Sequence, residues 1–135
     1  MAFYTVKKTK LWLIKAVNRR TGRTIAWVHG GRDSGTFRRL YDKVKHLKDC
    51  TFYTDAWDAF AEVLPPERHK IGKQHTVAVE RDNSNTRHHL GRFTRRTKVV
   101  SKSPEMVDLS IRLCCAMTTP EVFKEWQNQM LCIFR

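Results

Sequence analysis

The chain has 135 residues, with 26 lysines and arginines against 13 aspartates and glutamates, a formal net charge of +13 and an isoelectric point of about 10.1. This length suits one domain with a real core rather than two. A domain this basic usually binds a polyanion, most often nucleic acid, although a ribosomal structural protein or a membrane-surface binder would share the charge. No stretch approaches the roughly 18 consecutive apolar residues of a membrane span. Residues 1–6 lack the charged-then-apolar order of a signal peptide.

The four cysteines do not follow a zinc-binding pattern. Cys50, Cys114, Cys115 and Cys132 include no C-x-x-C pair, and no histidine stands at a zinc spacing from them. Cys114 and Cys115 lie in an apolar helical stretch, which indicates reduced core or partner-facing residues of a cytosolic protein.

The first part of the chain predicts an antiparallel meander of three strands. A polar turn separates the first two strands, and a loop with Gly22, which is suited to a positive φ, leads into the third. The three segments are rich in aromatic, aliphatic and β-branched residues. They are residues 3–6, 11–17 and 24–29.

Helical and strand patterns alternate after the meander. Asp33 or Ser34 caps a helix that runs to about Leu47, since apolar residues recur there at helical spacing. The elements expected next are a strand at 51–54, a short helix at 58–63 stopped by Pro65 and Pro66, an edge strand within 68–72, and a helix over 76–90 ended by Gly91.

Two more helices are predicted towards the C-terminus. Ser103 caps the first, with Pro104 at its first helical position, and this helix runs to about Met117. Pro120 starts the second helix in the same way. The residues expected on their apolar sides are Met106, Leu109, Ile111, Leu113 and Cys114 for the first helix, and Val122, Phe123 and Trp126 for the second.

This order of elements predicts an α/β fold. Three antiparallel strands followed by helix-crossed parallel strands is the ribonuclease-H-like plan, with a mixed sheet of about five strands flanked by helices and a helical C-terminal tail. Other α/β folds share the pattern, so this step rests partly on analogy.

Asp55 and Glu80 are the candidate metal ligands. Asp55 stands at the end of a predicted strand, where ligands of open α/β sheets tend to bind, and Glu80 lies in the first turns of a predicted helix. Carboxylates that converge from two such elements can hold a hard cation such as Mg²⁺, and two bridged cations can carry out phosphoryl transfer. On spacing alone, a turn residue and a solvated helical glutamate are the more common roles.

Basic residues accompany Glu80. Arg87 follows it by seven positions, nearly two turns, so the two lie on one helix face. His75 is a candidate for orienting the attacking water or contacting a DNA phosphate, although a lone histidine before a helix is more often simply exposed. The densest basic run of the chain comprises Arg87, His88, His89, Arg92, Arg95, Arg96 and Lys98. Its arginines and its lysine are expected to bind DNA.

Several motifs occur together: Arg20-Thr21-Gly22-Arg23, Gly31-Arg32-Asp33, Tyr53-Thr54-Asp55-Ala56-Trp57, Gly72-Lys73-Gln74-His75-Thr76, Glu80-Arg81 with Asn83, Asn85 and Arg87, and Ser101-Lys102-Ser103. Their combination resembles the catalytic half of the transposases of the bacterial insertion sequence one family, over about residues 3 to 112. The resemblance implies a ribonuclease-H-like fold and a DDE triad, two aspartates and one glutamate, that binds two Mg²⁺ or Mn²⁺ ions. By resemblance, Asp55 is the second aspartate, Glu80 is the glutamate and Arg87 is the basic residue that follows it.

The resemblance also implies partners. One partner is double-stranded DNA, both as the terminal repeats of the element and as the target. The other is either a further copy of the chain or the product of the upstream reading frame, which carries the family's zinc-finger and helix-turn-helix region. No membrane partner is expected. The expected location is the bacterial cytoplasm, in association with the nucleoid.

The chain departs from the family at the first aspartate. That residue belongs on the first strand, yet residues 1–6 contain no acid, and Asp33 matches a family position after the third strand. We expect a truncated start or a replaced aspartate. Residues after about 116 no longer match, which divides the chain into a catalytic domain, 1–116, and a divergent helical tail, 117–135.

Two functions follow from these observations. The favoured one is metal-dependent cleavage and transfer of element-end DNA, with little activity expected from this chain alone. The alternative is a non-catalytic DNA-binding product or decayed copy that regulates transposition or merely remains from it.

Overall fold

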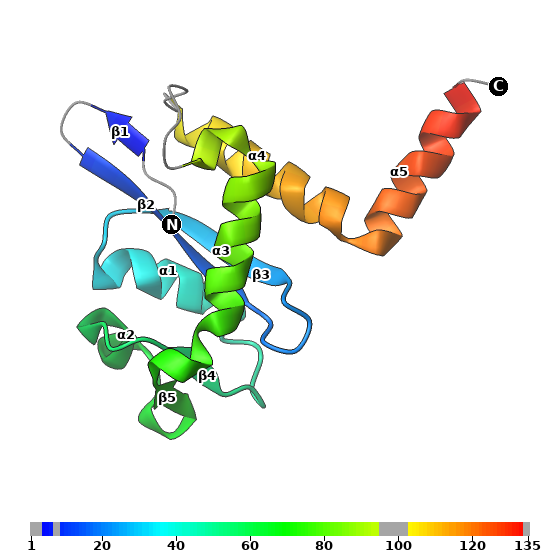
Figure 1. Ribbon diagram of the computed structural model, residues 1–135. Helices are drawn as coiled ribbons and strands as arrows, with labels where there is room; N and C mark the ends of the chain where they lie inside the picture. The colour runs from blue at the N-terminus through cyan, green and yellow to red at the C-terminus, as the bar shows by residue number, and fades with distance from the viewer. Residues whose placement is uncertain (1–3, 7–8, 95–102, 134–135) are drawn as a thin grey trace.

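The computed structural model describes residues 4–6, 9–94 and 103–133 (Figure 1). The strands are β1 (Tyr4–Val6), β2 (Thr9–Val17), β3 (Thr24–Gly30), β4 (Phe52–Thr54) and β5 (His69–Ile71). The helices are α1 (Ser34–Val44), α2 (Asp58–Val63), α3 (Val77–His89), α4 (Pro104–Thr118) and α5 (Pro120–Ile133), with short 3-10 helices η1 (Pro66–Arg68), η2 (Lys73–His75) and η3 (Gly91–Phe93). The predicted elements agree with these bounds to within three residues.

The predicted meander is confirmed as an antiparallel sheet in the order β1-β2-β3. Tyr4 pairs with Leu11, and Trp12 pairs with Gly30. Gly22 has the expected positive φ, at 69°, in the loop between β2 and β3. β4 and β5 form a separate parallel pair.

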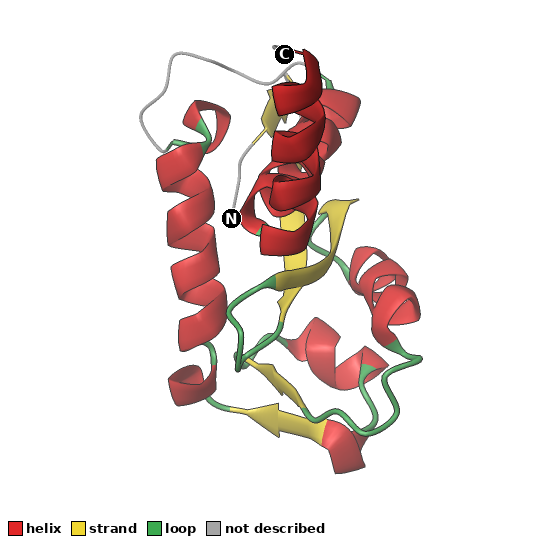
Figure 2. Ribbon diagram, turned by 90° about the vertical axis from the view of Figure 1, so that its right-hand side faces the viewer, coloured by secondary structure: helices red, strands yellow, loops and turns green. Residues whose placement is uncertain are grey.

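The expectation of one mixed sheet of five strands is therefore wrong for the described residues. Figure 2 shows the strand pair β4–β5 apart from the three-stranded sheet. The two sheets stay separate because a cleft lies between them, lined on one side by β2 and on the other by β4. Because the cleft separates their backbones, no hydrogen-bonded ladder connects these two strands.

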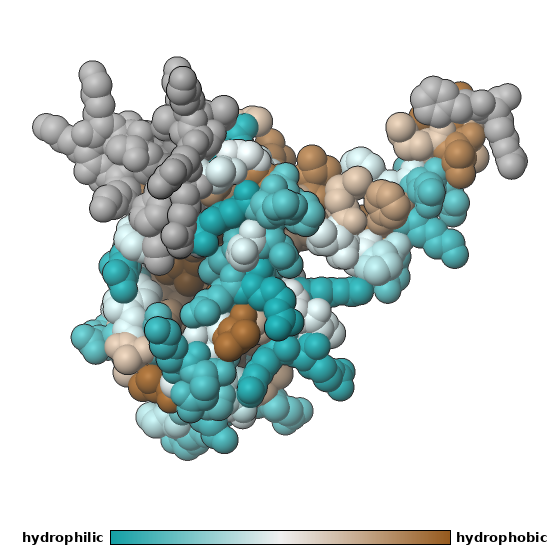
Figure 3. Space-filling model, viewed as in Figure 1, coloured by the Kyte–Doolittle hydropathy of each residue, from teal (hydrophilic) through white to brown (hydrophobic). Residues whose placement is uncertain are grey.

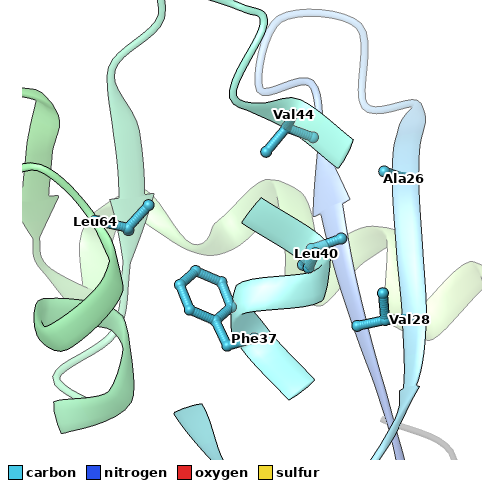
Figure 4. Packing of buried hydrophobic residues seen from close by; sticks show 6 residues of the cluster. All are labelled: Ala26, Val28, Phe37, Leu40, Val44 and Leu64. Atoms are coloured by element: carbon cyan, nitrogen blue, oxygen red, sulfur yellow. The ribbon is translucent and has the colours of Figure 1, made fainter. Parts of the chain in front are cut away.

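Apolar packing on α1 joins the two sheets instead. Phe37, Leu40 and Val44 recur at helical spacing and are at most 6% exposed. Figure 4 shows them between Leu64, just after α2, and the side chains of β3. Asp33 caps α1 by accepting a hydrogen bond from the Thr36 amide at 2.7 Å, and this bond lowers the pKa of Asp33.

The apolar side predicted for α4 is largely wrong. Ile111 is buried as expected, at 2% exposure, but its buried neighbour is Val107, and both pack against Leu13 and Phe93. Met106, Leu109 and Leu113, which were expected on the same apolar side as Ile111, are about half exposed. Residues on both faces of α4 are apolar, so their spacing could not identify the side that faces the body.

An ion pair anchors α3 to the sheet. The Lys15 side chain on β2 is 2% exposed and pairs with Asp82 on α3, whose side chain is 16% exposed. The Lys15 ammonium also donates to Thr86 Oγ1 at 2.8 Å, and Thr24 Oγ1 donates to the Asp82 carboxylate at 3.1 Å. This network sets where α3 lies on the sheet.

A second polar contact anchors α4. Trp27 Nε1 on β3 donates to Asp108 Oδ1 at 2.8 Å, and Arg112 pairs with Asp108 at 2.7 Å. Partial burial by itself would raise the pKa of Asp108, but the Trp27 hydrogen bond and the Arg112 charge together lower it.

Within the described ranges, none of the helices has both the length and the apolar character needed to span a bilayer.

We predict that Lys15→Met destabilises the fold by about 3–5 kcal/mol, because it leaves the Asp82 carboxylate without its cation in a mostly buried place. The double variant Lys15→Met/Asp82→Leu should recover most of this loss, since no unpaired charge remains. Urea unfolding monitored by tryptophan fluorescence measures both values. Equal losses in the single and double variants would contradict this role for the pair.

We predict that Asp108→Asn costs about 1–2 kcal/mol at neutral pH, because a hydrogen bond to a charged acceptor becomes a neutral one. The pKa of Asp108 is lowered in the folded state. The stability that the ionised Asp108 carboxylate contributes is therefore fully present above its unfolded-state pKa of about 3.9. This stability is lost as the pH falls through the lower folded-state pKa. Stability curves of wild type and Asp108→Asn should converge below about pH 3.9; curves that stay parallel into acid would contradict the contact.

Candidate functional site

The cleft between the two sheets is the candidate site. It has a volume of about 460 Å³ and is lined by β2, α1, β4 and the start of α3. Its lining includes Asp55, His75, Glu80 and Asn83. These side chains come from three separate segments of the chain, and the fold brings them to one cavity.

Asp55 directly follows β4. It is exposed, and its Oδ1 accepts a hydrogen bond from the Trp57 amide at 3.3 Å. Thr54 Oγ1 donates to the Asp55 carbonyl at 2.9 Å. These local bonds hold the carboxylate at the strand end, as expected for a residue that ends a strand and starts a turn.

Glu80 lies in the first turn of α3. It is exposed, and its amide donates to the Thr76 carbonyl at 3.0 Å. Asn83 follows on the same face and also lines the cleft. Arg87, a further turn along, is half-buried and is not part of the lining. The helix thus presents Glu80 and Asn83 to the cleft, while Arg87 lies beyond it.

His75 is packed rather than simply exposed. It closes η2, and its ring centroid lies 4.9 Å from that of Tyr53. Its Nδ1 is buried and has no hydrogen-bond partner among the described residues. An unsatisfied nitrogen costs free energy unless a water or a ligand atom reaches it. His75 thus lines the cleft with a buried, unsatisfied nitrogen, which a group bound in the cleft could reach only if the ring turned.

Arginine–aromatic stacks line the same cleft and were not predicted. The Arg32 guanidinium lies 5.1 Å from the Trp12 ring centroid and 5.3 Å from that of Trp57. Arg19 lies 4.8 Å from the Tyr53 ring centroid. Such contacts hold cations in place with their charge unneutralised. The signal in the sequence was the placement of Tyr53 and Trp57 two residues on either side of Asp55.

The residues present do not complete a two-metal site. No cluster of three or more histidine, cysteine, aspartate or glutamate side chains with metal-binding geometry occurs in the described part of the chain. Asp55 and Glu80 supply two carboxylates, whereas two bridged cations need more anionic oxygen ligands than these. Asp82 is not a third ligand, because it is committed to Lys15.

The described residues of the basic run lie at the other end of α3. Arg92 is in η3, which follows directly after this helix, and is half-buried. At about 1.5 Å per residue, the last residue of α3, His89, lies roughly 14 Å along the helix from Glu80. Arg95, Arg96 and Lys98 fall outside the described residues. The cleft lies at the start of α3, whereas Arg87, His88 and His89 lie in its last turn and Arg92 lies just beyond it.

The sequence matches the IS1 transposase family over residues 1–117. The Insertion element IS1 protein InsB of Shigella flexneri is 33% identical over 102 residues, which cover 76% of this chain and 78% of that protein. The InsB protein of Shigella sonnei is 32% identical with the same coverage.

The Insertion element IS1 2 protein InsB of Escherichia coli strain K12 is 33% identical over 102 residues, which cover 76% of this chain and 61% of that protein. The matched segment is therefore less than two thirds of the length of this relative. No solved structure matches the chain. A family match that spans residues 1–117 decides the assignment: the chain belongs to the IS1 transposase family, a family of DNA transposition proteins.

Proposed function

We propose that the chain is the catalytic region of an IS1-type transposase, which binds element-end DNA and presents Asp55 and Glu80 to the phosphate that is cut. The observation that supports this most directly is that both carboxylates line one cleft although they come from separate elements. The residues up to 116 form the catalytic domain of this proposal, and residues 117–135 form a tail outside it. The protein would act in the cytoplasm, on the nucleoid.

The DNA would lie along α3. Phosphate contacts by arginine and lysine supply most of the affinity of DNA-binding proteins, and they hold the duplex in position without reading its sequence. The roughly 14 Å of helix between Glu80 and His89 corresponds to about four base steps of one strand. Arg92, just beyond this end of the helix, would then hold the duplex a few base pairs from the cleaved bond, and Arg95, Arg96 and Lys98 follow it in the sequence as further candidate DNA contacts.

Each residue at the cleft has a task in this proposal. Asp55 and Glu80 are the carboxylates that a divalent cation, Mg²⁺ or Mn²⁺, would bind, and the family implies a divalent metal requirement. His75 Nδ1 would contact the water or a phosphate oxygen. Arg19 and Arg32, held on aromatic rings, would offset the charge that develops on the phosphate.

A second candidate function is DNA binding without cleavage. The observation in its favour is the absence of a third carboxylate beside Asp55 and Glu80 among the described residues. Such a protein would occupy element ends and so regulate transposition. The basic charge serves both functions equally, so that affinity for DNA does not separate them.

We predict slow nicking of supercoiled plasmid in Mg²⁺ or Mn²⁺, reduced at least about tenfold by Asp55→Asn and by Glu80→Gln. Asp49→Asn and Glu67→Gln, which make the same charge changes away from the cleft lining, serve as matched controls and should retain wild-type rates. Activity that is unchanged in the two cleft variants would refute the proposed site. No metal-dependent activity in wild type, with DNA binding intact, would establish the second candidate function instead.

We predict that Arg92→Ala weakens binding of element-end and unrelated DNA alike and lowers the slope of log affinity against log salt by about one. Fluorescence anisotropy with labelled duplexes at several salt concentrations measures this slope. Arg38→Ala on the exposed face of α1 is the matched control. Loss of affinity for only one DNA sequence would show base recognition rather than a phosphate contact.

A further inference from the structure

The last helix does not pack on the body of the protein. Every residue from 120 to 133 is exposed, and Figure 1 shows α5 projecting away from the rest of the fold. Its first turn makes an exposed ion pair, between Arg23 and Glu121 at 3.9 Å. A helix of this length is marginal by itself in water, so an additional packing surface would stabilise it.

The exposed helix carries an ordered apolar stripe. Phe123, Trp126, Met130 and Ile133 follow one another at steps of three, four and three residues, the spacing of a helix that packs along another helix. Their exposed fractions run from 42% to 73%. The opposite face carries Lys124 and other polar residues. We call the four apolar residues the α5 stripe.

A second stripe lies on α4, facing away from the body. Met106, Leu109, Leu113 and Met117 are between 45% and 54% exposed, whereas Ile111 on the other face is buried. Figure 3 shows apolar side chains gathered along this helix and towards the end of α5. We call these four residues the α4 stripe. Both stripes belong to one continuous arm, residues 104–133.

The charge of the arm differs from that of the body. It carries four acidic and two basic side chains in a chain whose net charge is +13. A surface for DNA would be basic, which excludes DNA as the ligand of the stripes. Two strongly basic bodies repel each other, so two copies of the chain can approach most easily through this apolar and slightly acidic part.

The exposed area is sufficient for a stable contact. The two stripes together offer eight large side chains, each about half exposed, or on the order of 800 Å² per copy. A standard protein–protein interface buries about 800 Å² on each partner. This much exposed apolar side-chain surface on neighbouring helices is unusual on a protein that remains a monomer.

We propose that the partner of the arm is a second copy of the chain. The α5 stripe of one copy packs on the α4 stripe of the other, and the reverse contact forms at the same time, which gives a closed, two-fold symmetric dimer. The α4 stripe of the same copy is not the receptor, because α5 points away from α4 after Thr119 (Figure 1). This dimer does not depend on catalysis at the cleft.

Analytical ultracentrifugation of the full chain, without DNA, tests the proposal. Wild type should be a dimer at micromolar concentrations. Phe123→Glu/Trp126→Glu and Leu109→Glu/Leu113→Glu should each dissociate it, with affinity reduced at least about 100-fold. Lys124→Glu/Asn128→Glu, on the polar face of α5, is the matched control and should stay dimeric. All of these side chains are exposed, so circular dichroism should show an unchanged fold.

The dependence on salt concentration distinguishes the dimer contact from DNA binding. Higher salt screens the repulsion between the two bodies, so the dimer should persist or tighten while affinity for DNA falls. A wild-type monomer at tens of micromolar would overturn the proposal. So would a dimer that survives either stripe variant, because the reciprocal contact needs both stripes.

Discussion

The position of α3 depends on one ion pair in the interior of the molecule. Lys15 on β2 and Asp82 on α3 are largely removed from water, and threonine hydroxyls contact both partners. A buried pair of this kind adds little net stability, but any placement that separates its members is costly. Its effect is therefore to select one register of α3 on the sheet. Glu80 lies two residues before Asp82, so the same constraint brings Glu80 to the cleft.

The cleft itself results from how the two sheets are held. A continuous ladder from β2 to β4 would leave no space between them, whereas packing on Phe37, Leu40 and Leu64 joins the sheets at one side only. The opposite side remains open, and Asp55, in the turn after β4, is one of the residues that line this space. The fold thus gains a cavity at the cost of backbone pairing, which suits a site that must admit a phosphate and its counter-ions.

Elements defined by local chemistry could be predicted from the sequence. Ser103 is a helix cap in the structure as predicted, and Asp33 is the cap of the two candidates Asp33 and Ser34, because a cap depends on residues a few positions away. The placement of Asp55 and Glu80 at one cleft agrees with their positions on the predicted strand and helix. The exposed face of α4 could not be predicted, because both faces are apolar and only tertiary contact distinguishes Val107 from Leu109. The burial of Lys15 in an ion pair could not be predicted for a similar reason, because its partner Asp82 is distant in sequence.

Binding and cleavage place different demands on this chain. Holding DNA requires positive charge spread over a surface, and loss of one contact lowers affinity only in part. Cleavage requires carboxylates fixed around cations, where a missing ligand weakens every later step. The described residues provide the positive charge that holding DNA requires. Of the carboxylates that cleavage requires, they bring two, Asp55 and Glu80, to the cleft. A dimer formed through α4 and α5 would leave both clefts in the bodies, away from the interface, so self-association would increase the number of DNA contacts without altering the ligands at either cleft.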